Sequence, residues 1–360
     1  MNSAVVHPLA WWAWAVGVAA FASQTTNPWL TSLAIAVTIL VTLARRGDHP
    51  WAAAFRLYLI AGAVIVAVRL AFRVLLGSAA GGHVLVDLPQ IPLPDWVLGI
   101  HLLGPVTSES LLFGLYDGLR LAAIVIAVGA ANALANPKKL LRTLPPALYE
   151  LGTALVVALT VLPQLADSLA RVRRAQLLRE GDSSRGGRLR RVVVPVLEDA
   201  LERSMALAAG MDTRGYGRSA GASRRERWIT GALMLVGLFG LCVGAYALLD
   251  PTVMNGTLAG LTVAVGLAVC VLGLVSAGGR VARTTYRPQR VRGHDVGLVA
   301  TGLVVGFAGW WVAHHDTVVA HPLVTVAPTL SLTAMIAILI ALAPLVLVPS
   351  PVADAVEVPA

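Results

Sequence analysis

Long apolar runs separated by short polar connections dominate this sequence. Most of the runs approach the roughly 20 apolar residues that a helix needs to cross a bilayer. The pattern therefore predicts an all-α polytopic membrane protein with about eight transmembrane helices. The predicted spans are residues 9–24, 28–44, 53–77, 109–135, 228–248, 256–278, 295–313 and 328–349.

Lysine and arginine occur only on every second connection between these runs, which indicates the topology. The connections 25–27, 78–108, 249–255 and 314–327 contain neither residue. Because basic residues gather on the cytoplasmic side, the basic connections should lie inside, together with the N- and C-termini. We therefore expect a multi-pass protein in the cell membrane of a prokaryote. The basic connections are Arg45–Arg46, Lys138–Lys139 with Arg142, residues 171–227 and residues 280–292.

Residues 147–168 are also apolar, but Pro163 interrupts them and Pro145–Pro146 precede them. If this stretch crossed the membrane, the basic segment 171–227 would lie outside, against the distribution of basic residues. We therefore expect 147–168 to lie along the cytoplasmic interface, where amphipathic helices with basic flanks settle.

The composition excludes a soluble globular protein. The chain is 57% hydrophobic and only 13% charged, whereas soluble domains carry about 25% charge. Its net charge of +9 follows from the positive cytoplasmic side, and the basic segment lacks the interleaved aromatic residues typical of nucleic-acid binding. The cysteines, Cys242 and Cys270, lie in apolar runs and indicate neither a disulfide framework nor a metal site.

The apolar and basic segments together predict the domain organisation. A cytoplasmic insert of amphipathic helices should separate two membrane regions, and a Pro- and Ala-rich tail should be disordered. The external loop 78–108 is long and rich in Gly and Pro. The predicted regions are 1–143 (membrane), 144–226 (cytoplasmic helices), 227–349 (membrane) and 350–360 (tail).

The basic insert carries half of the chain's 28 Lys and Arg residues, between positions 171 and 227. Residues 192–213 are helix-patterned, with Leu197, Leu201 and Met205 on one stripe and Glu198 and Asp199 on the other side. Gly215 should end this helix in a left-handed conformation. The pattern predicts a comparable helix over residues 164–179. Each helix ends in an arginine soon followed by glycine, which ordinary helix capping also explains.

The stretch 104–217 resembles the T component of energy-coupling factor (ECF) transporters, the family that includes the cobalt-transport membrane subunit. The Met211–Gly217 segment (Met-Asp-Thr-Arg-Gly-Tyr-Gly) carries the most specific part of this resemblance. The supporting segments are Gly104–Thr107 with Glu109, Gly118–Leu121, Asn136–Pro137 with Leu140–Leu141, residues 158–169, Arg174–Gln176, His7–Pro8, Asn27–Pro28 and Tyr286–Pro288.

This resemblance implies a membrane scaffold that joins a substrate-binding membrane subunit, the S component, to two cytoplasmic ABC-type ATPases. Coupling helices of the family end in Ala-Arg-Gly-like motifs whose arginines dock in the ATPases. The first motif corresponds to Leu178, Arg179 and Glu180, where Glu180 replaces the usual glycine. The second motif corresponds to Thr213, Arg214 and Gly215.

Asp117 and Arg120 lie in the fourth predicted span. Because an arginine at the centre of a membrane helix costs about 2.5–3.5 kcal/mol, a partner is expected. We interpret the two as a local pair that supports helix packing, with a substrate or proton-relay role as the alternative. Arg69 and Arg73, near the outer end of the third span, should snorkel toward the interface.

The sequence favours a non-catalytic coupling subunit of an importer for a vitamin or metal ion. It contains no Gly-x-x-x-x-Gly-Lys-Ser/Thr motif, so ATP hydrolysis would belong to partner subunits, and neither a cofactor nor a bound metal is predicted. One alternative is a membrane-embedded transferase, but the external loop 78–108 has no basic residue to hold a phosphate. The other is a secondary transporter, which predicts charges in several spans rather than in one insert.

Overall fold

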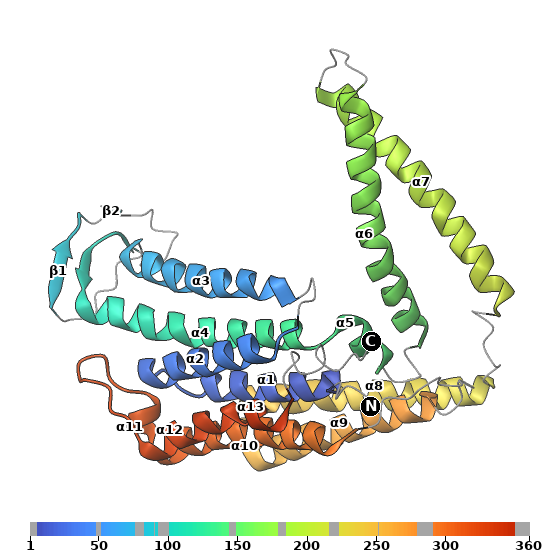
Figure 1. Ribbon diagram of the computed structural model, residues 1–360. Coiled ribbons are helices and arrows are strands. Elements are labelled where there is room, and N and C mark those ends of the chain that lie inside the picture. The colour runs from blue at the N-terminus through green and yellow to red at the C-terminus, as the bar shows by residue number, and fades with distance from the viewer. Residues whose placement is uncertain are drawn as a thin grey trace, which may run out of the picture. The chain divides into compact units, whose positions relative to one another are not determined.

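A computed structural model describes residues 6–47, 52–75, 83–89, 91–92, 101–143, 149–178, 185–215, 223–250, 252–278 and 291–349. Long helices account for most of this chain, which confirms the predicted all-α polytopic class (Figure 1). Its contacts form two compact units, Met1–Leu140 with Gln289–Ala360, and Leu141–Pro288. The C-terminal helices therefore belong to the same unit as the N-terminal ones.

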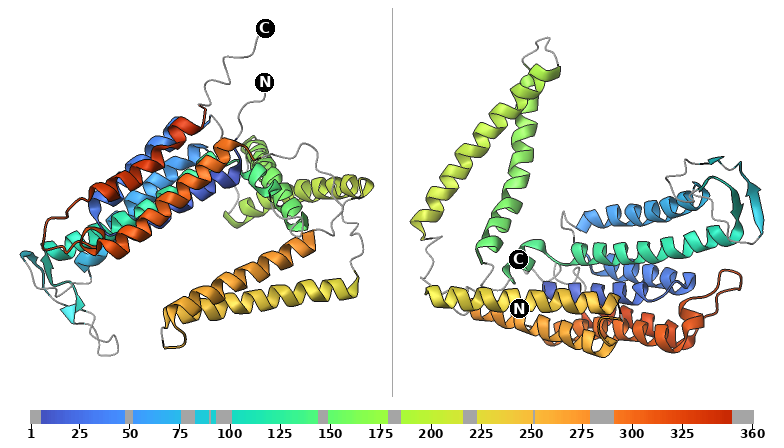
Figure 2. Two further views of the ribbon diagram at one scale, coloured as in Figure 1. Left: turned by 90° about the horizontal axis from the view of Figure 1, so that it is seen from below. Right: turned by 180° about the vertical axis from the view of Figure 1, so that it is seen from behind.

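The first unit is a bundle in which α1 contacts α2, α4 and α10 (Figures 1 and 2). Trp14 of α1 is fully buried and its indole Nε1 donates to the carbonyl oxygen of Ala341 at 3.1 Å. The helices are α1 (Pro8–Ser23), α2 (Pro28–Arg45), η1 (Ala52–Ala54), α3 (Phe55–Leu75), α4 (Ser108–Leu134), α5 (Pro137–Arg142), α10 (Gly293–His315), α11 (Thr317–Ala320), α12 (Leu332–Leu339), η4 (Ile340–Leu342) and α13 (Pro344–Leu347).

The pairs His7–Pro8 and Asn27–Pro28 begin α1 and α2. His7 and Asn27 are the N-caps, and each side chain accepts a backbone N–H of the first turn. A proline fits the first helical position because its missing N–H would have no partner there. Both short motifs of the sequence are thus helix starts.

Two glycines let α1 and α10 touch backbone to backbone. A β carbon on Gly302 would lie 2.4 Å from the carbonyl oxygen of Ala13, and one on Gly17 would lie 2.0 Å from that of Gly302. Membrane helices pack closely at such positions because no side chain separates their backbones.

Residues predicted as an irregular external loop contain four short strands. β1 (Val84–Asp87) pairs antiparallel with β4 (Pro105–Thr107), with Val84 opposite Thr107. β2 (Ile91–Pro92) pairs with β3 (His101–Leu102). The N–H of Leu103 then donates to the carbonyl of Leu75 at 2.7 Å, which satisfies one of the free acceptors at the end of α3.

The second unit consists of two helix pairs, α6 with α7 and α8 with α9. In the α8–α9 pair, a β carbon on Gly266 would lie 2.7 Å from the backbone N of Leu241. This pair therefore crosses at glycine, as α1 and α10 do. The helices are α6 (Tyr149–Leu177), α7 (Arg185–Thr213), α8 (Arg224–Leu249) and α9 (Gly256–Gly278).

Seven helices of the described residues are long and apolar enough to cross a membrane, judged by length and composition. The first and last predicted spans are shorter helices, because α1 has 16 residues and η4 interrupts the last run. Residues Gly152–Gln176 of α6 also qualify, so our placement of 147–168 at the interface stays a prediction. The seven are Pro28–Arg45, Ala52–Leu75, Ser108–Leu134, Gly152–Gln176, Trp228–Leu249, Gly256–Gly278 and Gly293–His315.

Candidate functional site

The predicted basic insert forms two long helices. α6 is one continuous helix of 29 residues that includes Pro163, so the apolar stretch 147–168 and the predicted helix 164–179 are parts of one helix. A proline removes one backbone hydrogen bond, which bends or breaks many helices. Here the helix continues through Pro163.

α7 also has 29 residues and begins at Arg185, seven positions before the predicted start at 192. Gly186 and Gly187, which lie before the predicted start, are therefore in its first turn. α6 and α7 converge where α6 ends and α7 begins, and they separate toward the other two ends (Figures 1 and 2).

The C-terminal end of α7 has the predicted glycine termination. Gly215 has φ +74°, and its N–H donates to the carbonyl of Asp212 at 2.9 Å. A β carbon at Gly215 would meet nothing within 4 Å, so the left-handed backbone rather than crowding favours glycine here. This confirms the end that the sequence predicted.

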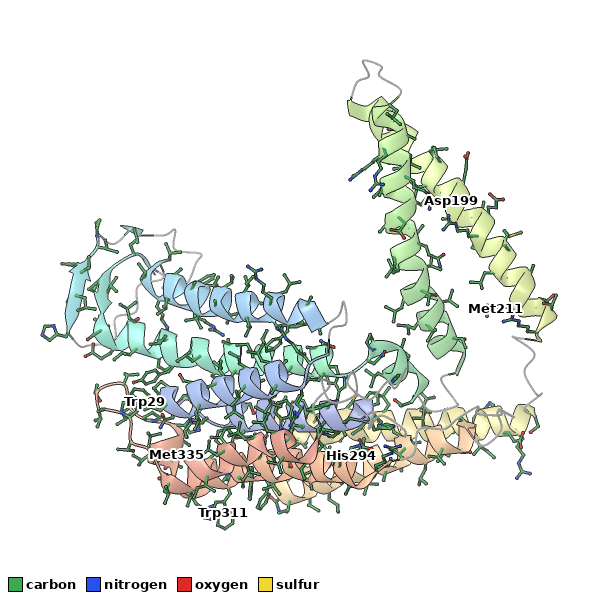
Figure 3. The ribbon with its side chains drawn as sticks, in the orientation of Figure 1. Trp29, Asp199, Met211, His294, Trp311 and Met335 are labelled. Carbon is green, nitrogen blue, oxygen red and sulfur yellow. The ribbon has the colours of Figure 1, made fainter. Side chains whose placement is uncertain are left out.

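The second motif lies at this end, close to Met211 (Figure 3). The hydroxyl of Thr213 donates to the carbonyl of Gly210 at 3.0 Å, and the N–H of Arg214 donates to that of Met211 at 3.1 Å. The Arg214 side chain is exposed. Within the described residues, no hydrogen bond or ion pair engages its guanidinium. A fixed backbone thus presents a free guanidinium.

Only one residue of the first motif can be located. Leu178 follows α6 and is 86% exposed, whereas Arg179 and Glu180 lie outside the described residues. A leucine this exposed buries almost none of its side chain within the chain itself. The role of Arg179 stays a prediction.

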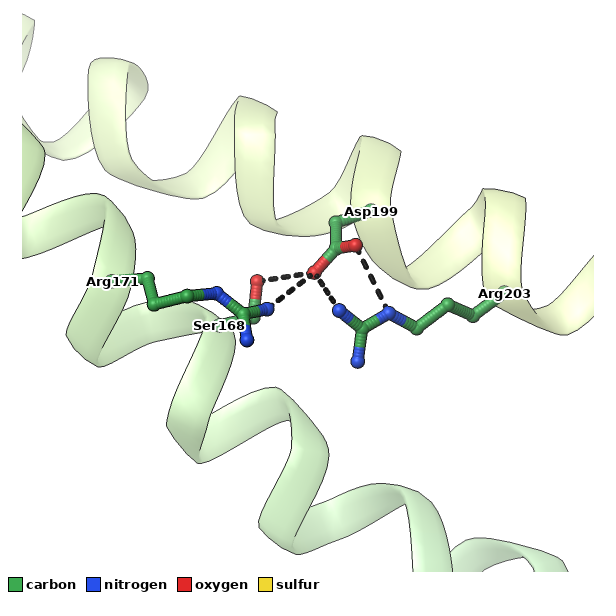
Figure 4. A network of polar contacts seen from close by, with 4 residues as sticks. All are labelled: Ser168, Arg171, Asp199 and Arg203. Atoms are coloured by element: carbon green, nitrogen blue, oxygen red, sulfur yellow. Dashed lines mark hydrogen bonds and ion pairs between the residues drawn. The ribbon is translucent and has the colours of Figure 1, made fainter.

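One carboxylate joins α6 to α7. Oδ2 of Asp199 accepts the hydroxyl of Ser168 at 2.6 Å and a guanidinium nitrogen of Arg171 at 3.4 Å, both from α6 (Figure 4). Arg203, one turn along α7, reaches both carboxylate oxygens at 3.0 Å. The Ser168 hydroxyl, and secondly Arg203 and Arg171, hold the pKa of Asp199 below its usual value, against the opposing effect of burial.

This contact was not predicted. The helical pattern places Asp199 on the polar side of its helix but indicates no partner on another helix. The only signal was the Asp199–Arg203 spacing of four residues, which is typical of a pair within one helix. Ser168 is 2% exposed, but a lone serine in an apolar helix does not predict which helix it will face.

The apolar stripe of α7 is not used between the two helices. Leu197, Leu201 and Met205 are 61%, 65% and 66% exposed. The half-buried residues lie on the side of Asp199, at Val192, Val196 and Ala200. An apolar stripe on a helix usually packs against another element. Within the described residues this stripe is largely uncovered, so it can pack against a partner protein or the membrane.

Asp117 and Arg120 do not form the predicted pair. Asp117 instead pairs with Arg69 of α3 at 3.1 Å, and Arg120 donates to the carbonyl of Ser23 at the end of α1. α3 comes close because Gly118 faces it, where a β carbon would lie 3.1 Å from the Cα of Val66. The negative end of a helix dipole offers Arg120 an alternative to a carboxylate.

The C-terminal ends of α3 and α10 carry other polar side chains. The guanidinium of Arg73 lies 4.3 Å from the ring centre of Phe113, a cation–π contact. The expected snorkelling of Arg69 and Arg73 toward the interface stays a prediction. His315 stacks on Trp311 with ring centres 3.7 Å apart. In the described part of the chain, no group of three His, Cys, Asp or Glu residues could hold a metal ion.

Comparison with known families places these helices in context. Residues 3–228 match the family described as CbiQ, cobalt transport protein. The match includes α1 to α7 and ends near the start of α8. It therefore contains both arginine motifs and the Ser168–Asp199 contact.

Two curated relatives carry the same description, energy-coupling factor transporter transmembrane protein EcfT. The protein of Macrococcus caseolyticus is 26% identical over 138 residues, covering 34% of this chain and 52% of the relative. That of Thermanaerovibrio acidaminovorans is 27% identical over 169 residues, covering 40% of this chain and 62% of the relative. The chain thus matches between half and two thirds of the length of these relatives.

Proposed function

Because this chain belongs to the CbiQ cobalt transport protein family, we propose that it is the T component of an ECF importer. In this role it couples two cytoplasmic ABC-type ATPases to a substrate-binding S component. The partners hydrolyse ATP and bind the substrate, whereas this chain is a non-catalytic membrane scaffold. The S component determines the substrate, which we expect to be a vitamin or a metal ion.

The free guanidinium of Arg214 is the observation that carries this proposal. Arginine presents a rigid fork of donors that suits carboxylates or helix-end carbonyls in a partner groove. An exposed arginine that becomes buried in a partner's groove is typical of binding hot spots, which contribute about 2 kcal/mol or more to the binding free energy. The Gly215 turn holds the backbone beside Arg214, so little backbone order has to be gained on docking.

The separation of the two motifs supports two docking sites. Leu178 of the first motif precedes α7 in the chain and Thr213 of the second motif is its last residue. With 29 residues, α7 is about 43 Å long at 1.5 Å per residue. If one ATPase subunit binds at each end of α7, the movement of either subunit displaces the α6–α7 pair.

Docking to cytoplasmic ATPases requires α6 and α7 to face the cytoplasm. We propose that α6 does not cross the membrane, since a crossing would place the basic segment outside. A reporter fused at Ser184 should then signal the cytoplasm, and one fused at Gly82 the exterior. An exterior signal at Ser184 would show that α6 spans the membrane.

The docking role is tested by copurification of the ATPases in mild detergent. The double variant Arg179→Glu/Arg214→Glu should lose the ATPase pair while remaining in the membrane, because glutamate reverses both docking charges. A matched control is Arg173→Glu/Arg225→Glu, which makes the same charge change at two exposed arginines. Full ATPase recovery with the first variant, or equal loss with both, would rule out specific docking.

A further inference from the structure

The contact between α6 and α7 is narrow and mostly polar at its centre. Ser168 and Arg171 of α6 both donate to the same oxygen of Asp199. The apolar side chains beside it on α7 are small, Val196 and Ala200, and half-buried. Among the α7 side chains that the structure describes, the larger apolar ones at Leu197, Leu201 and Met205 are exposed, so in this part of the helix apolar packing contributes little to holding the pair in register.

Arg203 fixes the direction in which the Asp199 carboxylate points. Its Nε and a terminal nitrogen each reach a different carboxylate oxygen at 3.0 Å (Figure 4). Such two-point contacts add geometric specificity to the charge attraction. The carboxylate is therefore oriented by its own helix and offered to Ser168, which is 2% exposed.

The position of this contact along the helices gives it mechanical importance. Asp199 lies about 21 Å along α7 from Thr213, and Ser168 about 29 Å along α6 from Tyr149, at 1.5 Å per residue. A displacement at the Arg214 end reaches α6 either through the chain that connects the two helices or, midway along α7, through the Asp199 contact. If this contact slips, only the connecting chain remains to move α6 with α7.

We infer that Asp199 is a positioning residue that fastens α7 to α6, so that a displacement at the Arg214 end moves both coupling helices together. This inference rests on the proposed coupling role. Ser168 supplies the partner on α6, and Arg203 orients the carboxylate. Substrate movement would then depend on a residue that binds neither ATP nor the substrate.

The test uses the full complex with its ATPases and S component, reconstituted in lipid vesicles. The variants are Asp199→Asn, Ser168→Ala and Asp199→Glu, with Glu202→Gln as control because Glu202 is an exposed carboxylate on the same helix. The readouts are the ATPase recovered per chain, ATP hydrolysis, and substrate uptake per ATP hydrolysed.

We expect Asp199→Asn and Ser168→Ala to retain the ATPases but to lower uptake per ATP by about fivefold or more, the usual lower range of coupling between sites. Asp199→Glu keeps the carboxylate and should recover part of the uptake. Glu202→Gln should match the unaltered protein. Double electron–electron resonance between labels at positions 154 and 207 should show a broader distance distribution in Ser168→Ala.

Two results separate this inference from the proposed function. If the unaltered chain recovers no ATPase, the proposed coupling role fails. If the ATPases bind but uptake per ATP and the label distances stay unchanged in Asp199→Asn and Ser168→Ala, the coupling role stands and the positioning role is wrong. Loss of ATPase binding in both variants would also contradict it, since Asp199 would then serve docking.

Discussion

Asn27 and Asp199 both connect helices through side-chain hydrogen bonds, in opposite surroundings. Asn27 is fully buried, and its amide nitrogen donates to the carbonyls of Val319 at 2.8 Å and Thr329 at 2.9 Å. The Asp199 side chain is 33% exposed and bonds Ser168 of one neighbouring helix. Asn27 is thus part of a closed interior, whereas Asp199 joins two helices that are otherwise largely uncovered.

The apolar residues differ in the same way. Trp14 and Leu298 of the first unit are fully buried, whereas Leu201 and Met205 of α7 are about two thirds exposed. Apolar burial within the chain stabilises the first unit but hardly α7. The comparison indicates that the first unit holds itself together, while the α6–α7 pair has surface left for partners.

The largest effect is expected where α1 meets α10. Gly302→Ala places a β carbon 2.4 Å from the carbonyl oxygen of Ala13, and backbone atoms cannot move aside as a side chain can. We expect the free energy of unfolding to fall by about 3 kcal/mol, the upper end for overpacking. The measurement is thermal unfolding of the detergent-purified chain, monitored as the decrease of its monodisperse peak in size-exclusion chromatography.

Gly231→Ala in α8 is the matched control, since a β carbon there meets nothing within 4 Å. This change should be neutral, or stabilise by about 0.5–1 kcal/mol through helix propensity. Equal behaviour of the two variants would mean that the backbone contact between α1 and α10 is not close in solution.

A smaller loss is expected from Asn27→Ala. The change leaves the buried carbonyls of Val319 and Thr329 without their donor and removes the N-cap of α2. Unsatisfied buried polar groups cost about 1–3 kcal/mol. The same unfolding assay should show Glu202→Ala, at an exposed residue inside α7, within about 0.5 kcal/mol of the unaltered chain. If Asn27→Ala matched that control, the first unit would not depend on polar contacts between distant segments.

Much of the fold could be predicted because membrane helices carry their signal in single apolar runs. The helix starts at Pro8 and Pro28 and the end at Gly215 agree with the structure to within a residue. The strands β1 to β4 could not be predicted, because segments of two to four residues show no periodicity.

The pairing of polar side chains between helices was the second feature that the sequence could not predict. Asp117 and Arg120 are close in sequence, yet Asp117 pairs with Arg69 and Arg120 with the end of α1. Which side chain wins depends on how near α3 and α1 approach, and glycines such as Gly118 set that distance. For the same reason the Ser168–Asp199 contact could only be found in the structure.

The central claim, that the Arg214 end of α7 meets an ATPase, is tested most directly by cross-linking. The chain's two cysteines are replaced by serine, and Asp212→Cys, at an exposed residue of the same helix end, leaves Arg214 in place. In the complex assembled from this variant, a short bifunctional reagent should link position 212 to an ATPase subunit. A second variant, Thr257→Cys at the start of α9, should give no link, because the proposed topology places that residue outside. Absence of a link from position 212 in an intact complex, or equal links from both positions, would contradict the account.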